Sequence, residues 1–234
     1  MKRSLALVLG LFLLPSTVGC SAFVRSTRLS ETLDNRFSTM YSTMEIPLTV
    51  GVVVPSEVRR HILSGQARFQ GNEEKQKKAP VYHYAVGRAI AAMMEPAAQI
   101  AFEFATQVRN LQEARKKKLD GILTVEILRN TLDVVFFYRK DPQGGGETPE
   151  KELVSIKGDV LLELEVTFYD LGHRPIWRQK ITSRQFDTFP PEGAQDDHLF
   201  DPLVEESVQH AIEEMVVGLK RAPELFDFSG TPRY

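Results

Sequence analysis

The sequence predicts an α+β domain built as a two-layer sandwich, with two main helices packed on one face of a mixed or antiparallel sheet. Residues 158–186 form two adjacent runs in which apolar and polar side chains alternate, which is typical of strands joined in a hairpin. Residues 86–101 and 201–219 place apolar side chains at every third or fourth position, which is typical of amphipathic helices. Elements with one apolar face bury those faces against one another, which predicts helices layered on a sheet.

The domain begins with one predicted strand. Residues 48–54 form a β-branched run that Pro55 ends, which predicts a buried strand. Residues 64–80 are polar and include a cluster of Glu and Lys. They predict a solvated loop, with a docking loop for a partner as the alternative.

The first main helix is predicted over residues 86–101. It contains Pro96, so a kink or a break is expected near Glu95. Residues 102–108 then alternate and favour a second strand, although a helix that continues to about Asn110 also fits the pattern.

A short helix is predicted over residues 111–118. Asn110 precedes it and Glu113 occupies its third position, which is the pattern of an N-cap with a capping box. The basic cluster at 115–118 suits the negative end of the helix dipole. A contact with phospholipid or another polyanion is the alternative for this cluster.

Two further strands are predicted over residues 121–128 and 131–139, with Arg129 and Asn130 as the reversal between them. Residues 141–146 follow as a turn. No Lys-Ser/Thr pair or helical pattern follows its glycines, so this turn is not predicted to bind phosphate.

The clearest alternation runs through residues 158–170 and returns over 176–186 after a turn. One face of this hairpin is predicted to be dry and the other mostly wet. Opposite charges are expected to pair across the wet face, from Glu163 and Glu165 to Arg178, Lys180 and Arg184.

The C-terminal part predicts a loop, a helix and a tail. Residues 189–193 form the loop, and Asp201 and Pro202 begin the second main helix, with proline in its first turn. Gly218 lies near the end of this helix. The tail at 222–234 is expected to pack back on the domain or to provide a small apolar contact.

The N-terminus has the layout of a secretory signal. Lys2 and Arg3 form a positive segment, and residues 5–14 form an apolar segment that is too short to cross a bilayer about 30 Å thick. Residues 17–20, Thr-Val-Gly-Cys, resemble the lipobox of bacterial lipoproteins, although that family usually has Leu in place of Thr.

The lipobox resemblance implies that Cys20 is acylated and becomes the first residue of the mature chain. Ser21 follows and, in the lipoproteins that the chain resembles, permits export to the outer membrane. An ordinary cleaved signal peptide with an incidental cysteine is the alternative. The predicted organisation is a signal peptide at 1–19, a lipidated tether at 20–46, an α+β periplasmic domain at 47–221 and a C-terminal tail at 222–234.

Composition excludes several classes of function. The chain has 29 Lys and Arg against 31 Asp and Glu, a formal net charge of −2, which argues against a dedicated nucleic-acid binder. Cys20 is the only cysteine, so no disulfide can form within the chain even in an oxidising envelope. Once acylated, it leaves no thiol for catalysis or metal binding.

No cofactor, metal or catalytic centre is expected. The five histidines lack the spacing of a zinc site, and acidic residues before a helix are explained by its dipole. Glu163 and Glu165 are better explained by cross-strand ion pairs than as a catalytic pair. A cleft that gathered Glu192, His198 and Asp201 would favour an enzyme. The strongest group of potential metal ligands lies before the second main helix and consists of Asp196, Asp197, His198 and Asp201.

Residues 114–125, Ala-Arg-Lys-Lys-Lys-Leu-Asp-Gly-Ile-Leu-Thr-Val, resemble the passage from a short helix to a central strand in envelope lipoproteins of the transport-auxiliary and TolB-amino-terminal-like type. The order of elements over 48–219 is similar too. This resemblance implies a non-catalytic accessory or assembly factor of an envelope transport or secretion complex. Its partners would be the membrane, through the acyl chains, and envelope proteins; self-association stays open. A carrier of a lipid or other apolar ligand between sheet and helices is the alternative and requires an apolar cavity.

We predict that the mature chain isolated from cells begins at an acylated Cys20, because residues 17–20 resemble a lipobox. More than one acyl chain is expected on Cys20, since stable anchoring requires more than one. Mass spectrometry of the mature N-terminus measures this directly. An N-terminus at another residue, or an unmodified Cys20, would contradict the lipoprotein assignment.

Overall fold

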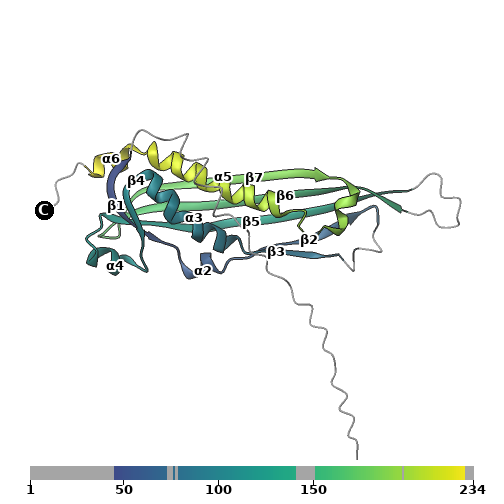
Figure 1. Cartoon of the computed structure of the whole chain (residues 1–234), viewed down its shortest axis with the longest axis horizontal. Coiled ribbons are helices and arrows are strands. Elements are labelled where there is room, and N and C mark those ends of the chain that lie inside the picture. The colour runs from purple at the N-terminus through teal and green to yellow at the C-terminus, as the bar shows by residue number, and fades with distance from the viewer. Residues whose placement is uncertain (1–44, 73–75, 77–78, 141–150, 197, 230–234) are drawn as a thin grey trace, which may run out of the picture.

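The computed structural model describes residues 45–72, 76, 79–140, 151–196 and 198–229. The described strands are β1 (Ile46–Val53), β2 (Leu63–Gln70), β3 (Val81–Tyr84), β4 (Phe102–Gln107), β5 (Gly121–Lys140), β6 (Lys151–Asp170) and β7 (Pro175–Phe189). The helices are α2 (Ser56–Arg59), α3 (Val86–Ala101), α4 (Leu111–Lys116), the 3-10 helix η2 (Pro191–Gln195), α5 (Asp201–Lys220) and α6 (Pro223–Ser229). The chain is therefore a mixed α/β protein, and Figure 1 shows its sheet curling along the long axis.

The sheet is organised around β5, which is 20 residues long. One edge of β5 pairs with antiparallel β6 along its full length. The other edge is shared by two parallel partners, β1 at residues 121–124 and β2 at residues 134–137. The strand β4 extends the sheet beyond β1, β3 beyond β2 and β7 beyond β6. The sheet therefore contains parallel and antiparallel pairs. It is mixed, which is one of the two arrangements that the sequence predicts.

The predicted reversal at Arg129 and Asn130 is wrong, because β5 continues through both residues. The register with β6 shifts between Ile127 and Arg129. An extra residue in one strand bends it locally without ending the ladder, so a polar pair that suggests a turn can be an irregularity in a long strand.

The predicted loop at 64–80 is also wrong in its first half, because β2 occupies it. Alternate residues of β2 are buried, and two of these inward residues are the small Gly65 and Ala67. A Cβ at Gly65 would overlap the backbone of Leu132, so the strand is this close to β5 only because glycine is there. Small inward residues give little hydropathy signal, which explains why the strand was missed.

The two main helices contact the sheet through different strands. They pack against each other, and α5 also contacts β6 and β7 while α3 contacts β1 and β4. Both helices cross in front of the strands in Figure 1. The predicted bounds of α3 and the strand after it are confirmed, and α3 is not broken at Pro96, which lies inside its 16 residues.

The local signals at the ends of α4 and α5 are also confirmed. Asn110 Oδ1 accepts the N–H of Glu113 at 3.0 Å, and a Glu113 carboxylate oxygen accepts the N–H of Arg109 at 2.9 Å. The first bond is the predicted N-cap, and the second is a variant of the predicted capping box in which Glu113 reaches the residue before the cap. Beyond α5, the tail forms α6 and packs back through Leu225, which has no exposed surface.

The turn between β6 and β7 depends on Asp170. Its carboxylate accepts the backbone N–H of Arg174 at 2.8 Å and the Nε of the same arginine at 2.7 Å. Burial alone would raise the pKa of Asp170, but these hydrogen bonds outweigh it and hold the pKa below its usual value. The hairpin is the predicted one, extended at both ends.

Within the described ranges, no helix combines the length and the apolar character needed to cross a bilayer.

We predict that Gly87→Ala destabilises the fold. Gly87 lies in the first turn of α3, and a Cβ there would overlap the carbonyl oxygen of Val58 in α2. Alanine is the better helix former by about 1 kcal/mol, yet overpacking against backbone costs about 1–3 kcal/mol. Urea unfolding should therefore show a net loss, whereas Gly193→Ala, which meets only a flexible Leu199 side chain, serves as the matched control. A stabilised Gly87 variant would contradict the close helix approach.

Candidate interaction surface

The sheet has a face directed away from α3 and α5, which we call the open face. Along β6, the residues Val160, Leu162, Leu164, Val166 and Phe168 are buried in the core, so their sequence neighbours point the other way. At one end of the sheet, α4 contributes to a small second apolar cluster of Val108, Ala114, Leu119 and Ile122. Outside that cluster the outer residues Leu161, Glu163 and Glu165 of β6 are half-buried, and Thr167 is buried.

Ion pairs cross the open face from strand to strand. Lys180 Nζ lies 3.1 Å from a carboxylate oxygen of Glu163, and Arg178 Nε lies 3.5 Å from one of Glu165. Both pairs confirm the predicted charge pairing across the hairpin. Each of the two glutamates, Glu163 and Glu165, thus forms an ion pair with a cation of β7.

The third predicted cation finds a different partner. Arg184 lies opposite Leu161 in the register, and its guanidinium reaches diagonally to Asp159 at 2.6 Å and 3.0 Å. The Arg184 hydrogen bond lowers the pKa of Asp159, although partial burial opposes it. The predicted pairing of Arg184 with Glu163 or Glu165 is therefore corrected. At the other edge of β5, Arg68 of β2 forms an ion pair with Asp133 of β5 at 2.5 Å.

An exposed aromatic ring lies among these charged side chains. Phe186 is directly opposite Asp159 in the β6–β7 register and is 68% exposed. In the next row of the ladder, Val135 pairs with Lys157. We call the surface formed by Phe186, Asp159, Lys157, Val135 and Phe137 the distal patch, since it lies toward the free end of the β5–β6 hairpin.

A groove of about 440 Å³ on the open face is lined in part by Asp159, the residue paired with Phe186. Its walls combine apolar and charged side chains from three strands: Arg68, Phe69, Gln70, Asp133, Val135, Phe137, Lys157 and Asp159. An apolar centre with a charged rim is the usual make-up of a protein-binding surface. The distal patch is therefore our candidate interaction surface.

A second groove, of about 450 Å³, lies on the open face beside α2. Its charged walls are Glu57, Glu126 and Glu165, and His61 also lines it. The His61 ring is held by Asn130, whose Nδ2 lies 2.7 Å from Nε2. Glu126 and Glu165 stand directly opposite each other in the ladder, which makes this part of the face acidic.

The sequence-predicted site residues do not assemble into a metal or catalytic centre where they can be examined. His198 Nδ1 lies 2.7 Å from Asp201, and the His198 N–H is donated to Asp196 at 2.8 Å. Asp197 and Cys20 fall outside the described residues. Among the described residues, no group of three potential ligands could hold a metal ion.

The space between the sheet and the main helices is lined by fully buried side chains, among them Leu164, Val166, Met94, Met215 and Val216. The two grooves described above lie on the opposite face. The alternative function of a carrier between sheet and helices thus stays a prediction without a described pocket.

No protein-family model matches the chain, and no curated protein matches it. The solved structures that are similar to the chain include three that each share 10% sequence identity or less with it. A homologue of neuraminyllactose-binding hemagglutinin from Helicobacter pylori has 10% identity and a TM-score of 0.40, covering 80% of this chain and 90% of that one. A PelC dodecamer from Paraburkholderia phytofirmans has 9% identity and a TM-score of 0.33, with coverage of 79% and 96%. Lipoprotein GNA1162 from Neisseria meningitidis has 8% identity and a TM-score of 0.30, with coverage of 72% and 99%. These values are too low to transfer a fold or a function.

We predict that Asp159→Asn weakens the distal patch in a pH-dependent way. The folded pKa of Asp159 is lowered, so its contribution to stability is present above the ordinary carboxyl pKa and is lost as pH falls through the lowered one. At pH 7 the variant should unfold at a urea concentration lower by roughly 0.2–0.5 M. The gap should close at acidic pH, whereas Glu152→Gln, at an exposed position on β6, should leave the midpoint unchanged. A gap that persists at low pH would rule out the ion pair as its cause.

Proposed function

We propose that the chain is a non-catalytic lipoprotein, anchored in the outer membrane through Cys20 and facing the periplasm. In this role it is an accessory or assembly factor of an envelope transport or secretion complex. The observation that carries the proposal is the distal patch, where an exposed phenylalanine stands on an ordered sheet beside a groove with a charged rim.

The exposure of Phe186 supports a binding role. Aromatic side chains are enriched among the residues that dominate binding energy at protein interfaces. A partner that covered Phe186 would bury most of a ring that is now 68% exposed, while Lys157 and Asp159 would remain at the rim to fix the orientation.

The rigidity of the site supports the same role. Phe186 lies on β7, which pairs with β6 from residue 156 to residue 169, and β6 in turn pairs with all of β5. The pair Arg184–Asp159 holds the strands beside it. A site on paired strands requires little ordering on binding, so less of the interaction energy is lost to conformational entropy.

The predicted anchor supplies the remaining element of the proposal. Acyl chains on Cys20 would confine the domain to one membrane surface and raise its effective concentration near a complex in that membrane. A modest patch of this kind then suffices for stable association.

We predict that a photoreactive phenylalanine analogue at position 186 crosslinks to an envelope protein in living cells, because this ring is the proposed anchor. The readout is mass spectrometry of the crosslinked species from tagged full-length protein. The matched control places the same analogue at position 104, where Phe104 is also exposed, at 50%, but lies on β4 at the other side of the sheet.

Crosslinks from position 186 to transport or secretion components, absent from position 104, support the proposal. Equal crosslinks from both positions would mean that the distal patch has no special role. Crosslinks from position 186 only to the chain itself would replace the accessory function with self-assembly. Lipid that copurifies with the protein, without any crosslink, would favour the carrier.

A further inference from the structure

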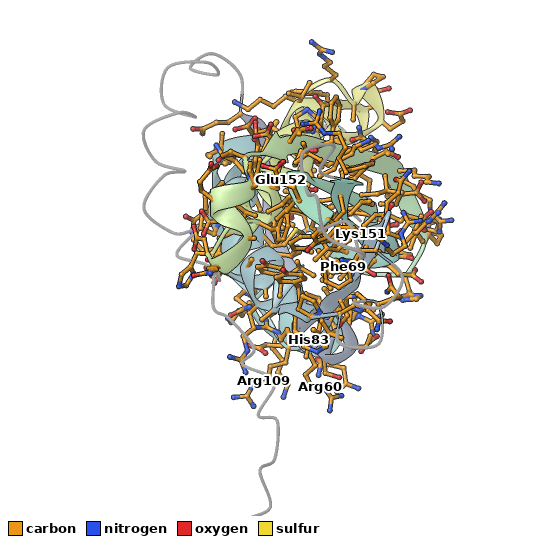
Figure 2. The ribbon with its side chains drawn as sticks, turned by 90° about the vertical axis from the view of Figure 1, so that its right-hand side faces the viewer. Arg60, Phe69, His83, Arg109, Lys151 and Glu152 are labelled. Carbon is orange, nitrogen blue, oxygen red and sulfur yellow. The ribbon has the colours of Figure 1, made fainter. Side chains whose placement is uncertain are left out.

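A second surface, on α2, the β4–α4 connection and α4, is rich in cations. We call it the basic side. Its members are Arg59, Arg60, Arg109, Arg115, Lys116, Lys117 and Lys118. Both short helices lie along the lower margin of Figure 1, and Figure 2 shows that Arg60 and Arg109 both project from this margin. The fold thus gathers two basic segments that lie far apart in the sequence.

A groove of about 580 Å³ lies at the centre of the basic side. It runs between α2 and the start of α4 and is lined by Val53, Val54, Pro55, Ser56, Arg59, Gln107, Val108, Arg109 and Glu113. Its two arginines come from different elements, Arg59 from α2 and Arg109 from the two residues that precede α4. Arginine side chains are well suited to bind phosphate or carboxylate, because each guanidinium group can donate two parallel hydrogen bonds.

Both arginines keep donors for a ligand. Among the described residues, the Arg59 side chain donates from Nε alone, to the carbonyl oxygen of Val54 at 3.1 Å, which fixes the stem and leaves the terminal nitrogens. Within the described residues, the side chain of Arg109 makes no hydrogen bond or ion pair. Beside them, Arg60 is held over Ser56 by bonds of 3.2 Å and 3.4 Å and adds a further charge.

The one carboxylate in the groove is already engaged. Glu113 accepts the N–H of Arg109 at 2.9 Å and faces Lys117 Nζ at 3.2 Å. These contacts, the backbone bond first, lower its pKa below the usual value, so it is ionised and its charge is balanced locally. Glu113 thus completes the capping box without cancelling Arg59.

Acidic side chains gather on a different element. The helix α5, which crosses in front of the strands in Figure 1, bears Glu205, Glu206, Glu213 and Glu214. Although the whole chain has a formal net charge of only −2, its domain is charged unevenly from side to side. Near an anionic surface, such a domain orients its basic side toward that surface.

We infer that the groove between Arg59 and Arg109 binds the phosphate of an anionic phospholipid headgroup, so that the domain lies with its basic side against the bilayer. The inference rests on the proposed anchoring through Cys20, which would hold the domain at a membrane. The chain from Cys20 to Ile46 reaches at most about 90 Å, which is ample for this contact. The acidic α5 of a second copy is the competing occupant.

The test uses the complete mature polypeptide with Cys20→Ser, which removes acyl anchoring and leaves only headgroup binding. Sedimentation with phosphatidylcholine vesicles containing a quarter phosphatidylglycerol should show binding that weakens as salt rises. Arg59→Gln with Arg109→Gln should reduce the partition coefficient roughly 20-fold, since each cation near an anionic surface contributes about fivefold. The matched control, Arg139→Gln with Lys151→Gln, removes the same charge at the far end of the hairpin and should change it little.

Several results would overturn the inference. These are absence of binding, equal binding to pure phosphatidylcholine vesicles, or equal loss in the two double variants. Salt-sensitive self-association without vesicles, abolished by the Arg59 and Arg109 changes, would assign the groove to α5 of another copy. If the double variant unfolds, vesicle binding by Arg109→Gln alone is the deciding measurement, because the Arg109 side chain makes no hydrogen bond or ion pair within the described residues.

Competition by free glycerol phosphate as strong as by vesicles would assign the site to a soluble phosphate. None of these outcomes depends on the crosslinking of position 186, so the proposed accessory function stands or falls separately.

Discussion

The antiparallel pairing of β5 with β6 is the interaction on which the rest of the structure depends. It joins two 20-residue strands along their whole length and provides the edges to which the other strands attach. The short strands β1 and β2 share a single edge of β5, and neither is long enough to span it. The connection between them therefore crosses the middle of that edge, which places α2 there. The acidic groove and the basic groove both border this short helix.

Elements whose signals are local could be predicted from the sequence. The capping hydrogen bonds of α4 join Arg109, Asn110 and Glu113, so their geometry follows from residues at most four apart. The alternation in β6 reflects two different media on the two sides of one strand, and it appears directly in residue order. By contrast, β2 has Gly65 and Ala67 on its inward side, so its burial depends on how closely β5 approaches. That distance is a tertiary property and leaves no hydropathy signal.

The candidate sites were less accessible to prediction because they depend on register and on contacts between distant segments. The charges of the hairpin were correctly assigned to one face, yet the partner of Arg184 is Asp159, four residues before Glu163 on β6. Alternation with Arg184 already places Phe186, the last residue of the predicted strand, on the wet face, whereas its position opposite Asp159 depends on the β6–β7 register. The basic cluster at 115–118 was visible in the sequence, whereas its continuation through Arg59 and Arg109 appears only when α2 and the β4–α4 connection meet.

The two proposed surfaces are compatible in one molecule because they share no residue. The distal patch is formed by β5, β6 and β7 toward the hairpin end, and the basic groove by α2, β4 and the start of α4. A bilayer that contacts Arg59 and Arg109 leaves Phe186 on a different part of the surface. Membrane contact would then restrict the rotation of the domain as well as its distance from the membrane. A partner in the same membrane would meet the distal patch in a limited range of orientations, which lowers the entropic cost of binding beyond what a tether alone achieves.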